Sequence, residues 1–451
     1  MSSTTRWIDH WDPEDTAFWE TTGKRVARRN LIFSILTEHI GFSIWSLWSV
    51  MVLFMTPEQG FTLDAGEKFL LVSCATLVGA LVRLPYTFAV PRFGGRNWTV
   101  FSAAVLLIPT VLTAVFMQRP DTSFATFLVL AAITGLGGGN FASSMANISF
   151  FYPERQQGTA LGLNAAGGNL GVPAVQLVGL FVIAFVGQTS PAVVAMVYLP
   201  LLIVAVTCAA LFMDNLTSAR SDVAAQLAVV RDRHTWVMSF LYIGTFGSFI
   251  GYSFAFGLVL QTQFGFTPLA AASLTFLGPL LGSLSRPLGG WLADRRGGAL
   301  VTFRTFVGMA LATLGILAAA PSESLPVFLA GFIALFVLSG IGNGSTYKMI
   351  PTIFAAQART AVDAGADPAE AQRTSRRLAA ALIGIAGAVG ALGGVFINVA
   401  FRFSFASYGT GTAAFVGFLA FYALCVAVTW RVYLRRPVAA TEVARPVLQG
   451  M

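Results

Sequence analysis

The sequence has few charged residues and few cysteines, and each shortage excludes a class of protein. Only 11% of its 451 residues are charged, whereas 56% are hydrophobic and the mean hydropathy is +0.73. Soluble domains carry about 25% charged residues, so this chain is neither a soluble domain nor a disordered protein. Its three cysteines all fall in apolar runs without paired spacing, which indicates neither a disulfide framework nor a metal site.

Long apolar runs are the main feature of the chain. A helix needs about 20 mostly apolar residues to cross a hydrocarbon core of roughly 30 Å. Twelve such runs predict an all-α polytopic membrane protein whose surroundings are the lipid bilayer. The net charge of +8 is then explained by loops, and no nucleic-acid partner is expected. The runs are 31–56, 67–91, 98–118, 123–150, 158–187, 190–213, 235–264, 268–293, 299–320, 326–354, 376–402 and 408–434.

The basic residues lie mostly on one side of the predicted spans. Segments on the side of the N-terminus hold 21 of the 28 Lys and Arg, and the opposite loops hold three. Because basic loops remain in the cytoplasm, we expect both termini to be cytoplasmic. We also expect 355–375 to be a long connection. The predicted organisation is a segment 1–30, a six-helix bundle 31–213, a linker 214–234, a second six-helix bundle 235–434 and a tail 435–451.

An internal repeat relates the two predicted halves. One shift of 203 residues places Arg83 on Arg286 and also places Asn140 on Asn343. Two separate motifs that obey one offset indicate a duplicated unit. The segment Gly290–Gly297 resembles the loop motif of the major facilitator superfamily. That resemblance implies two six-helix bundles about a pseudo-two-fold axis, with a central substrate cavity.

Two arginines of the repeat lie deep in predicted spans. Arg83 lies eight residues before Pro91, and Arg286 lies eight residues before Asp294, which is about 12 Å at the helical rise. An arginine at the midplane costs roughly 2.5–3.5 kcal/mol, and Glu38 is the only acid in the interior of a predicted span. Two facing guanidinium groups repel unless an anion lies between them, so we expect a small anionic substrate. The structural alternative is that each arginine bonds helix carbonyls or Glu38 and tethers helices.

Two longer motifs carry a family resemblance. Residues 137–153, which include Asn140 and Phe141, resemble the first nitrate signature of the nitrate/nitrite porters (NarK-like) of that superfamily. Residues 342–351 resemble the second signature. The resemblance extends over essentially the whole chain. It implies a secondary transporter, not an enzyme, that moves nitrate or nitrite across a bacterial cytoplasmic (inner) membrane by alternating access. We expect a monomer without cofactor or metal.

The resemblance also implies which residues bind the anion. Two arginines clamp it, aromatic rings of the fourth and seventh spans sandwich it, and asparagine amides add polar contacts. A planar anion offers two faces to rings and three oxygens to planar donors. The implied residues are Arg83, Arg286, Phe141, Tyr242, Phe246, Asn169, Asn140 and Asn343.

The coupling mechanism stays open between two possibilities. An exchanger of nitrate for nitrite needs no titratable group, whereas a proton symporter must bind a proton in its pathway. Glu38 and His39, in the first span, can exchange protons near neutral pH, and Lys348 is a third candidate. We expect nitrate/proton symport. The alternatives are nitrate/nitrite antiport and, in a different class, a passive anion channel.

Overall fold

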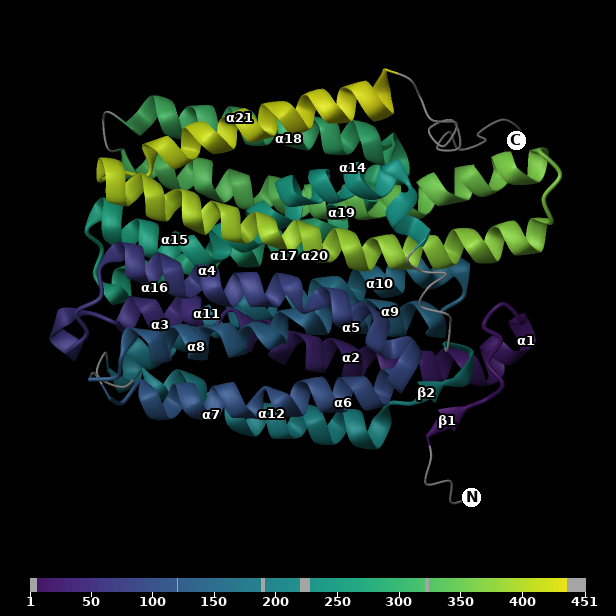
Figure 1. Ribbon diagram of the computed structural model, residues 1–451, viewed down its shortest axis with the longest axis horizontal. Helices are drawn as coiled ribbons and strands as arrows, with labels where there is room; N and C mark the ends of the chain where they lie inside the picture. The colour runs from purple at the N-terminus through teal and green to yellow at the C-terminus, as the bar shows by residue number, and fades with distance from the viewer. Residues whose placement is uncertain (1–5, 120, 188–190, 220–227, 321–323, 436–451) are drawn as a thin grey trace.

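The computed structural model describes residues 6–119, 121–187, 191–219, 228–320 and 324–435, and helices dominate it (Figure 1). Within these residues, twelve helical segments are long and apolar enough to cross a membrane. The predicted fold class is therefore confirmed. The segments are Thr16–Phe54, Ala65–Phe93, Gly95–Phe116, Phe124–Phe151, Arg155–Val186, Ala192–Phe212, Arg233–Phe264, Pro268–Arg296, Gly298–Ala319, Leu325–Asp363, Pro368–Tyr408 and Thr412–Leu434.

Most segments combine two or more α-helices separated by a tighter or wider turn. The first half contains β1 (Trp7–Ile8), α1 (Thr16–Phe18), α2 (Lys24–Trp45), α3 (Trp48–Phe54), α4 (Ala65–Leu81), α5 (Arg83–Phe93), α6 (Gly95–Val105), α7 (Leu107–Phe116), α8 (Phe124–Thr134), α9 (Asn140–Phe151), α10 (Glu154–Asn169), α11 (Gly171–Phe181), α12 (Ala192–Phe212) and β2 (Asn215–Leu216). The second half contains α14 (Arg233–Tyr242), α15 (Ser248–Phe264), α16 (Pro268–Thr275), α17 (Leu277–Arg296), α18 (Gly298–Ala319), α19 (Leu325–Asp363), α20 (Pro368–Tyr408) and α21 (Thr412–Thr429).

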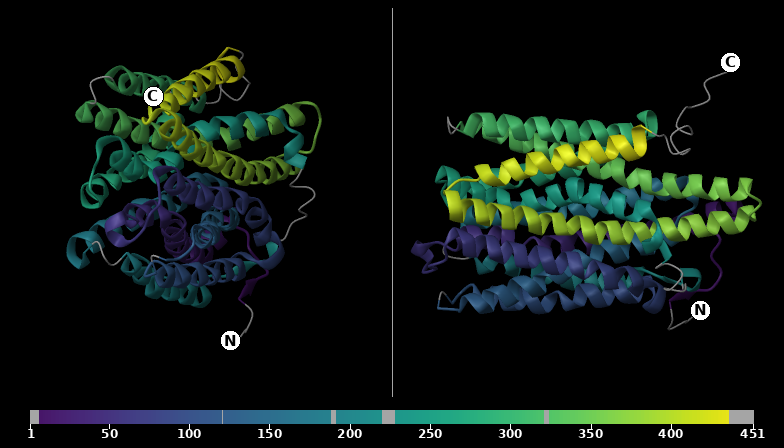
Figure 2. Two further views of the ribbon diagram at one scale, coloured as in Figure 1. Left: turned by 60° about the vertical axis from the view of Figure 1, so that its left-hand side comes forward. Right: turned by 45° about the horizontal axis from the view of Figure 1, so that its top comes forward.

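The two halves of the chain occupy two halves of the molecule. The first six spans, purple to teal, lie on one side, and the last six, teal to yellow, lie on the other (Figures 1 and 2). The repeat is visible in the backbone as well. Gly94 ends α5 at φ 89°, and Gly297 ends α17 at φ 86°. Both glycines adopt a conformation that L side chains rarely reach, so the same turn follows the same helix in each half.

Two helices change their winding near the middle of the molecule. A 3₁₀ turn, η3 (Gly135–Gly139), separates α8 from α9, and a π turn, η7 (Ile243–Gly247), separates α14 from α15. The glycines of η3 allow close helix contact: a Cβ at Gly137 would meet the carbonyl oxygen of Gly41. Such interruptions frequently accompany functional sites in helical proteins.

The segment 355–375 is not the long connection expected from its hydropathy. Helix α19 continues to Asp363 and α20 begins at Pro368. The side chain of Asp367 caps α20 by accepting a hydrogen bond from the backbone N–H of Glu370, at 2.8 Å. The 41 residues of α20 span about 60 Å, twice the hydrocarbon core. Charged residues lower hydropathy without breaking a helix. The hairpin of α19 and α20 projects beyond the neighbouring helices at the right of Figure 1.

A folded N-terminal strap, residues 6–23, lies at the same end of the molecule as this hairpin (Figure 1). Its strand β1 pairs in parallel with β2, which follows the sixth span. The indole N–H of Trp11 donates to the carbonyl of Phe150 at 3.1 Å, and Trp11 and Trp19 are buried in a small apolar cluster. We call this end the terminal face, because the first and last described residues both lie there.

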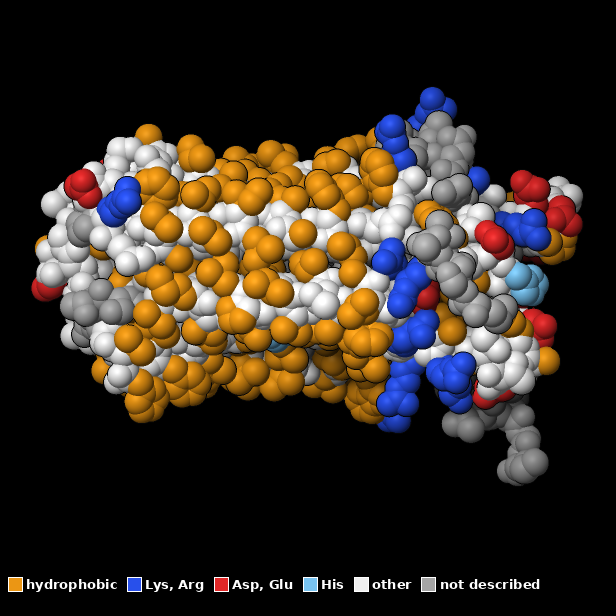
Figure 3. Space-filling model, turned by 90° about the horizontal axis from the view of Figure 1, so that it is seen from below, with side chains coloured by type: hydrophobic (Ala, Val, Ile, Leu, Met, Phe, Trp, Pro, Cys, Tyr) orange, Lys and Arg blue, Asp and Glu red, His pale blue; other side chains and the backbone are white. Residues whose placement is uncertain are grey.

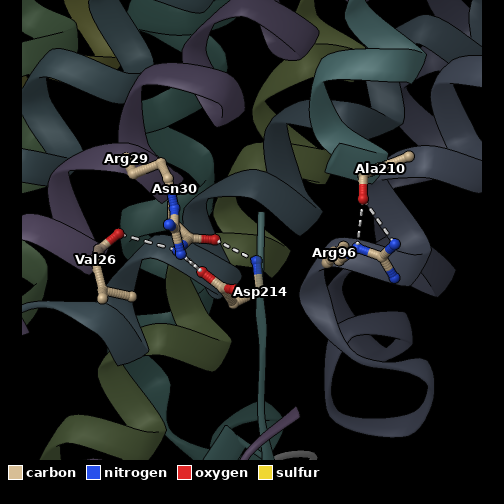
Figure 4. A network of polar contacts seen from close by, with 6 residues as sticks. All are labelled: Val26, Arg29, Asn30, Arg96, Ala210 and Asp214. Atoms are coloured by element: carbon tan, nitrogen blue, oxygen red, sulfur yellow. Dashed lines mark hydrogen bonds and ion pairs between the residues drawn. The ribbon is translucent and has the colours of Figure 1, made fainter. Parts of the chain in front are cut away.

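Polar contacts fasten the start of α2 to the end of the sixth span at the terminal face (Figure 4). The Asn30 amide N–H donates to Asp214 at 2.9 Å, and the Asp214 backbone N–H donates back to the Asn30 amide oxygen at 2.8 Å. Arg29 forms an ion pair with the same carboxylate at 2.6 Å. Nearby, Arg96 donates twice to the carbonyl of Ala210. This network fixes the geometry of the terminal face in the first half.

The surface divides into an apolar belt and a charged end. Figure 3 shows hydrophobic side chains over the long middle part and a band of Lys and Arg where the belt ends at the terminal face. Exposed apolar side chains include Phe101, Ile108, Ile203 and Leu311, each more than half exposed. Such a surface is stable in lipid and not in water.

Candidate substrate-binding site

Arg83 is the first residue of α5, and its side chain is completely buried. Its Nε–H donates to the carbonyl of Gly138 in η3, and its Nη1–H donates to the carbonyl of Gly387 in α20, both at 3.0 Å. Its Nη2 has no hydrogen-bond partner among the described residues. Arg83 therefore tethers helices of both halves, as the structural alternative expected, and still keeps one free donor nitrogen.

Arg286 lies in α17 and is 4% exposed. Its Nη2–H donates to the hydroxyl of Tyr242 at 3.1 Å, and its Nη1 has no partner among the described residues. Within the described part of the chain, neither Arg286 nor Arg83 forms an ion pair with a carboxylate. Each buried cation thus offers a free nitrogen and lacks a paired negative charge, which favours binding of an anion.

Aromatic rings join the two arginines. The ring of Phe141 lies 4.8 Å from Cζ of Arg83 and 5.7 Å from Cζ of Arg286. Phe246 lies 4.8 Å from Cζ of Arg83. It stacks on Phe141 at 5.9 Å and on Tyr242 at 5.2 Å between ring centroids. The structure therefore brings Arg83, Arg286 and all three aromatic rings of the expected set into one cluster.

The three expected asparagines are buried and share an unusual property. Asn140, Asn169 and Asn343 are at most 3% exposed, and both polar atoms of each amide lack a hydrogen-bond partner among the described residues. Most buried polar side-chain atoms are paired. Asn140 adjoins Phe141 and η3, so it lies beside the arginine cluster. Each of the three amides therefore has an unpaired N–H₂ donor group within the described residues.

Glu38 is buried in the first half near this cluster, at 1% exposure. One carboxylate oxygen accepts hydrogen bonds from the Ser144 hydroxyl and from the Asn164 amide, the latter at 2.7 Å. The other oxygen has no partner among the described residues. The single hydroxyl proton of Ser144 can be donated instead to the backbone carbonyl of Phe141, at 3.2 Å. Ser144 therefore lies within hydrogen-bond distance of both Glu38 and the backbone of Phe141.

The other two coupling candidates lie in different surroundings. The His39 ring bonds the carbonyl of Gly167 through Nδ1 at 3.1 Å. Lys348 forms an ion pair with Asp294 at 2.8 Å, and both side chains are about half exposed. Asp294 lies two helical turns beyond Arg286 on α17, toward the terminal face. The structure therefore groups Glu38 with the arginine cluster and places Lys348 outside it.

Tyr347 belongs to the cluster but was not among the expected residues. Its ring lies 5.1 Å from Cζ of Arg286, 5.3 Å from the Tyr242 ring and 6.2 Å from the Phe141 ring. Its buried hydroxyl has no hydrogen-bond partner among the described residues. The available signal was its position four residues, about one helical turn, after Asn343 inside the second signature.

The buried arginines show that the cluster is closed on both sides of the membrane. At 0% and 4% exposure, neither guanidinium of the Arg83 and Arg286 pair is open to bulk solvent. Twelve spans in two halves around a buried polar centre define a membrane transporter.

Comparisons with known proteins agree with this class. The family model described as Major Facilitator Superfamily matches residues 33–397. The chain belongs to the nitrate/nitrite porter (NarK-like) family of this superfamily, and so to transporters and not to enzymes.

Two curated relatives and one solved structure illustrate the match. The nitrate/nitrite transporter NarU of Escherichia coli K12 is 41% identical over 446 residues, covering 94% of this chain and 96% of that protein. The probable nitrate/nitrite antiporter NarK2 of Thermus thermophilus is 33% identical over 454 residues, covering 95% and 97%. The xylose transporter XylE of E. coli, in a partially occluded inward-open form, is similar with a TM-score of 0.65 at 15% identity. That alignment covers 91% of this chain and 98% of XylE, and it supports the fold alone.

Proposed function

We propose that this protein carries nitrate and nitrite across the bacterial cytoplasmic membrane by alternating access, with one anion bound between Arg83 and Arg286. The names of the relatives from E. coli and T. thermophilus support the substrate. The main observation in support of this site is that Arg83 and Arg286 both contact Phe141. Both guanidinium groups lie beside this ring, and each keeps one unpartnered nitrogen.

The chemistry of the cluster suits a flat, weakly hydrated anion. Planar guanidinium donors can bond oxygens lying in the plane of the anion, while Phe141, Phe246 and Tyr242 supply ring surfaces for its faces. Phosphate or sulfate would demand more hydrogen bonds and more compensating charge than a singly charged planar anion. The amides of Asn140, Asn169 and Asn343 complete the proposed set.

We further propose that nitrate uptake is coupled to proton uptake at Glu38. This carboxyl is buried and forms no ion pair within the described residues, and the Ser144 hydroxyl lies within hydrogen-bond distance of both Glu38 and the Phe141 backbone carbonyl. Protonation of Glu38 changes the charge beside two fixed cations, so it alters their attraction for the anion. His39 is a secondary candidate, and Lys348 is less favoured because Asp294 already pairs with it. Nitrate/nitrite antiport is the second candidate, favoured by the printed name of the Thermus relative.

The proposed orientation places the terminal face in the cytoplasm. The band of Lys and Arg there (Figure 3) agrees with the excess of basic residues in cytoplasmic segments. The transport unit is proposed to be a monomer whose bundles, 31–213 and 235–434, rock about the central site. The linker 214–234, the segment 1–30 and the tail 435–451 then lie in the cytoplasm; most of the tail falls outside the described residues.

Flux measurements in proteoliposomes test the proposal. Nitrate, nitrite and pH gradients are imposed separately on vesicles that contain the purified full-length protein. Symport predicts nitrate accumulation driven by an inwardly directed proton gradient alone. Antiport predicts no response to that gradient but fast nitrate entry into nitrite-loaded vesicles. A channel shows neither saturation nor stimulation by anion on the opposite side, and would contradict the carrier. Absence of flux under every gradient would contradict the function.

A further inference from the structure

A tryptophan outside the expected site residues contacts Arg83. Trp45 is the last residue of α2, and its side chain is completely buried. Its ring lies 5.1 Å from Cζ of Arg83, within the range of cation–π attraction. The rings of Phe42, Phe141 and Phe246 also lie within 5.7 Å of this atom. Four aromatic rings therefore surround the Arg83 guanidinium.

The indole of Trp45 forms a hydrogen bond that the three phenylalanine rings cannot form. Its N–H donates to the carbonyl of Ala75 in α4 at 3.0 Å. Two glycines form a slot for the ring. A Cβ at Gly79 would meet the indole nitrogen, and a Cβ at Gly138 would meet two indole carbons at 2.9 Å. No side chain larger than hydrogen fits at either position without moving Trp45.

The same slot fixes Arg83. Gly138, which packs against the indole, is the residue whose carbonyl accepts the Nε–H of Arg83 at 3.0 Å. Trp45 thus acts on Arg83 in two ways, directly through its ring and indirectly through the backbone of Gly138. A guanidinium that is oriented before the anion arrives loses less conformational entropy on binding.

We propose that Trp45 is a positioning residue that orients the guanidinium of Arg83 for anion binding. The expected effect of Trp45 on nitrate transport rests on the proposed function. The expected effect of Trp45 on the orientation of Arg83 does not. Trp45 sets the position of the cation and of the Gly138 carbonyl, while Arg83 makes the contact with the anion.

Two readouts on the full-length protein separate these effects. The first is the ¹⁵N–¹H signal of the Arg83 Nε–H group, identified by its loss in Arg83→Lys. The second is the KM and kcat of nitrate uptake in proteoliposomes. Trp45→Leu is expected to shift the Arg83 signal and to raise KM about tenfold, with kcat changing less. Trp45→Phe keeps a ring but loses the N–H bond, so it should lie between Trp45→Leu and wild type.

Gly79→Ala provides an independent variant that touches the indole and not the arginine. It should raise KM as Trp45→Leu does. The double variant should raise KM no more than either single variant. Trp48→Phe is the matched control, since Trp48 is equally buried three residues later and packs against Phe127 instead. It should leave the signal and KM unchanged.

The two proposals fail in different ways. An Arg83 signal that is unchanged in Trp45→Leu overturns the positioning role, whatever the flux. Fully additive KM effects of Gly79→Ala and Trp45→Leu overturn it as well. If the Arg83 signal shifts in Trp45→Leu but the wild-type protein transports no nitrate, the positioning role is supported and the proposed function is contradicted.

Discussion

The Nη1–H of Arg83 donates to the backbone carbonyl of Gly387 at 3.0 Å, which joins α5 of the first half to α20 of the second. The same guanidinium is fixed to η3 of the first half through Gly138. Any movement that separates the halves at this level must break the bond to Gly387. In the proposed mechanism, anion binding and the contact between the halves therefore involve the same side chain, so that binding can bias the movement of the halves.

The shape of the two guanidinium groups should matter beyond their charge. Arg83→Lys and Arg286→Lys keep a positive charge but lose the planar fork, so each is expected to weaken nitrate binding roughly 10- to 100-fold. The measurement is KM for nitrate uptake in proteoliposomes. Arg304→Lys, an exposed cation on α18, is the control. Wild-type KM in both site variants would contradict planar recognition.

Two glycines one turn apart on α20 should respond differently to the same substitution. A Cβ at Gly384 would lie 2.5 Å from Thr87 of α5, whereas a Cβ at Gly387 would lie 3.6 Å from both Arg83 and Phe141. Gly384→Ala should lower the Tm, because overpacking costs about 1–3 kcal/mol. Gly387→Ala should preserve the Tm and raise KM, since the methyl group occupies space beside the anion. Thermal unfolding and uptake assays distinguish them, and the reverse pattern would contradict the placement of the site.

Glu38→Gln tests the coupling while keeping the size of the side chain. The amide binds no proton in the physiological range, so a proton gradient should no longer drive nitrate accumulation. Nitrate/nitrite exchange should persist, because the arginines and rings are unchanged. His39→Gln is the comparison at the neighbouring position. Accumulation in Glu38→Gln equal to that of wild type under the same pH gradient would rule out Glu38 as the proton site.

The N-terminal strap offers a test of motion at the terminal face. Glu14 of the strap forms an ion pair with Arg376 of α20 at 3.2 Å, with both side chains about 40% exposed, so the pair itself contributes only about 0.2–1 kcal/mol. A flexible bismaleimide cross-link between Glu14→Cys and Arg376→Cys, in a chain without its three native cysteines, should lower turnover below that of the protein before cross-linking. Undiminished transport by the cross-linked protein would show that this contact does not move.

The network of Figure 4 should contribute to stability. Asp214→Ala removes the carboxylate that accepts one hydrogen bond from the buried Asn30 amide and forms the ion pair with Arg29. The bonds of Asn30 to the Val26 carbonyl and to the backbone N–H of residue 214 remain. Loss of a buried hydrogen-bonded partner costs about 1–3 kcal/mol, so the Tm in detergent should fall. Glu20→Gln breaks only the exposed pair with Lys24 and should change the Tm little. Equal effects of the two changes would contradict the burial of this network.

The sequence predicted the spans well because hydrophobic length is a strong signal. It predicted that Arg83 and Arg286 lie close together because the repeat gives them equivalent positions in the two halves. It failed for 355–375, where hydropathy alone cannot distinguish a charged loop from a charged helix. The cap at Asp367 followed by Pro368 was the available sign of a helix start. Tyr347 and Trp45 were missed since their roles depend on packing between distant segments. The second hydrogen bond of Arg83, to Gly387, spans 304 positions and follows from no local pattern.

The central claim is that one small anion binds between Arg83 and Arg286. The most direct test is uptake of nitrate and nitrite by proteoliposomes that contain the double variant Arg83→Gln/Arg286→Gln, with equal reconstitution verified beside wild type. We predict that saturable uptake of both anions is abolished, because Gln carries no charge to offset the desolvation of the anion. Saturable nitrate uptake that survives in this double variant would contradict the account.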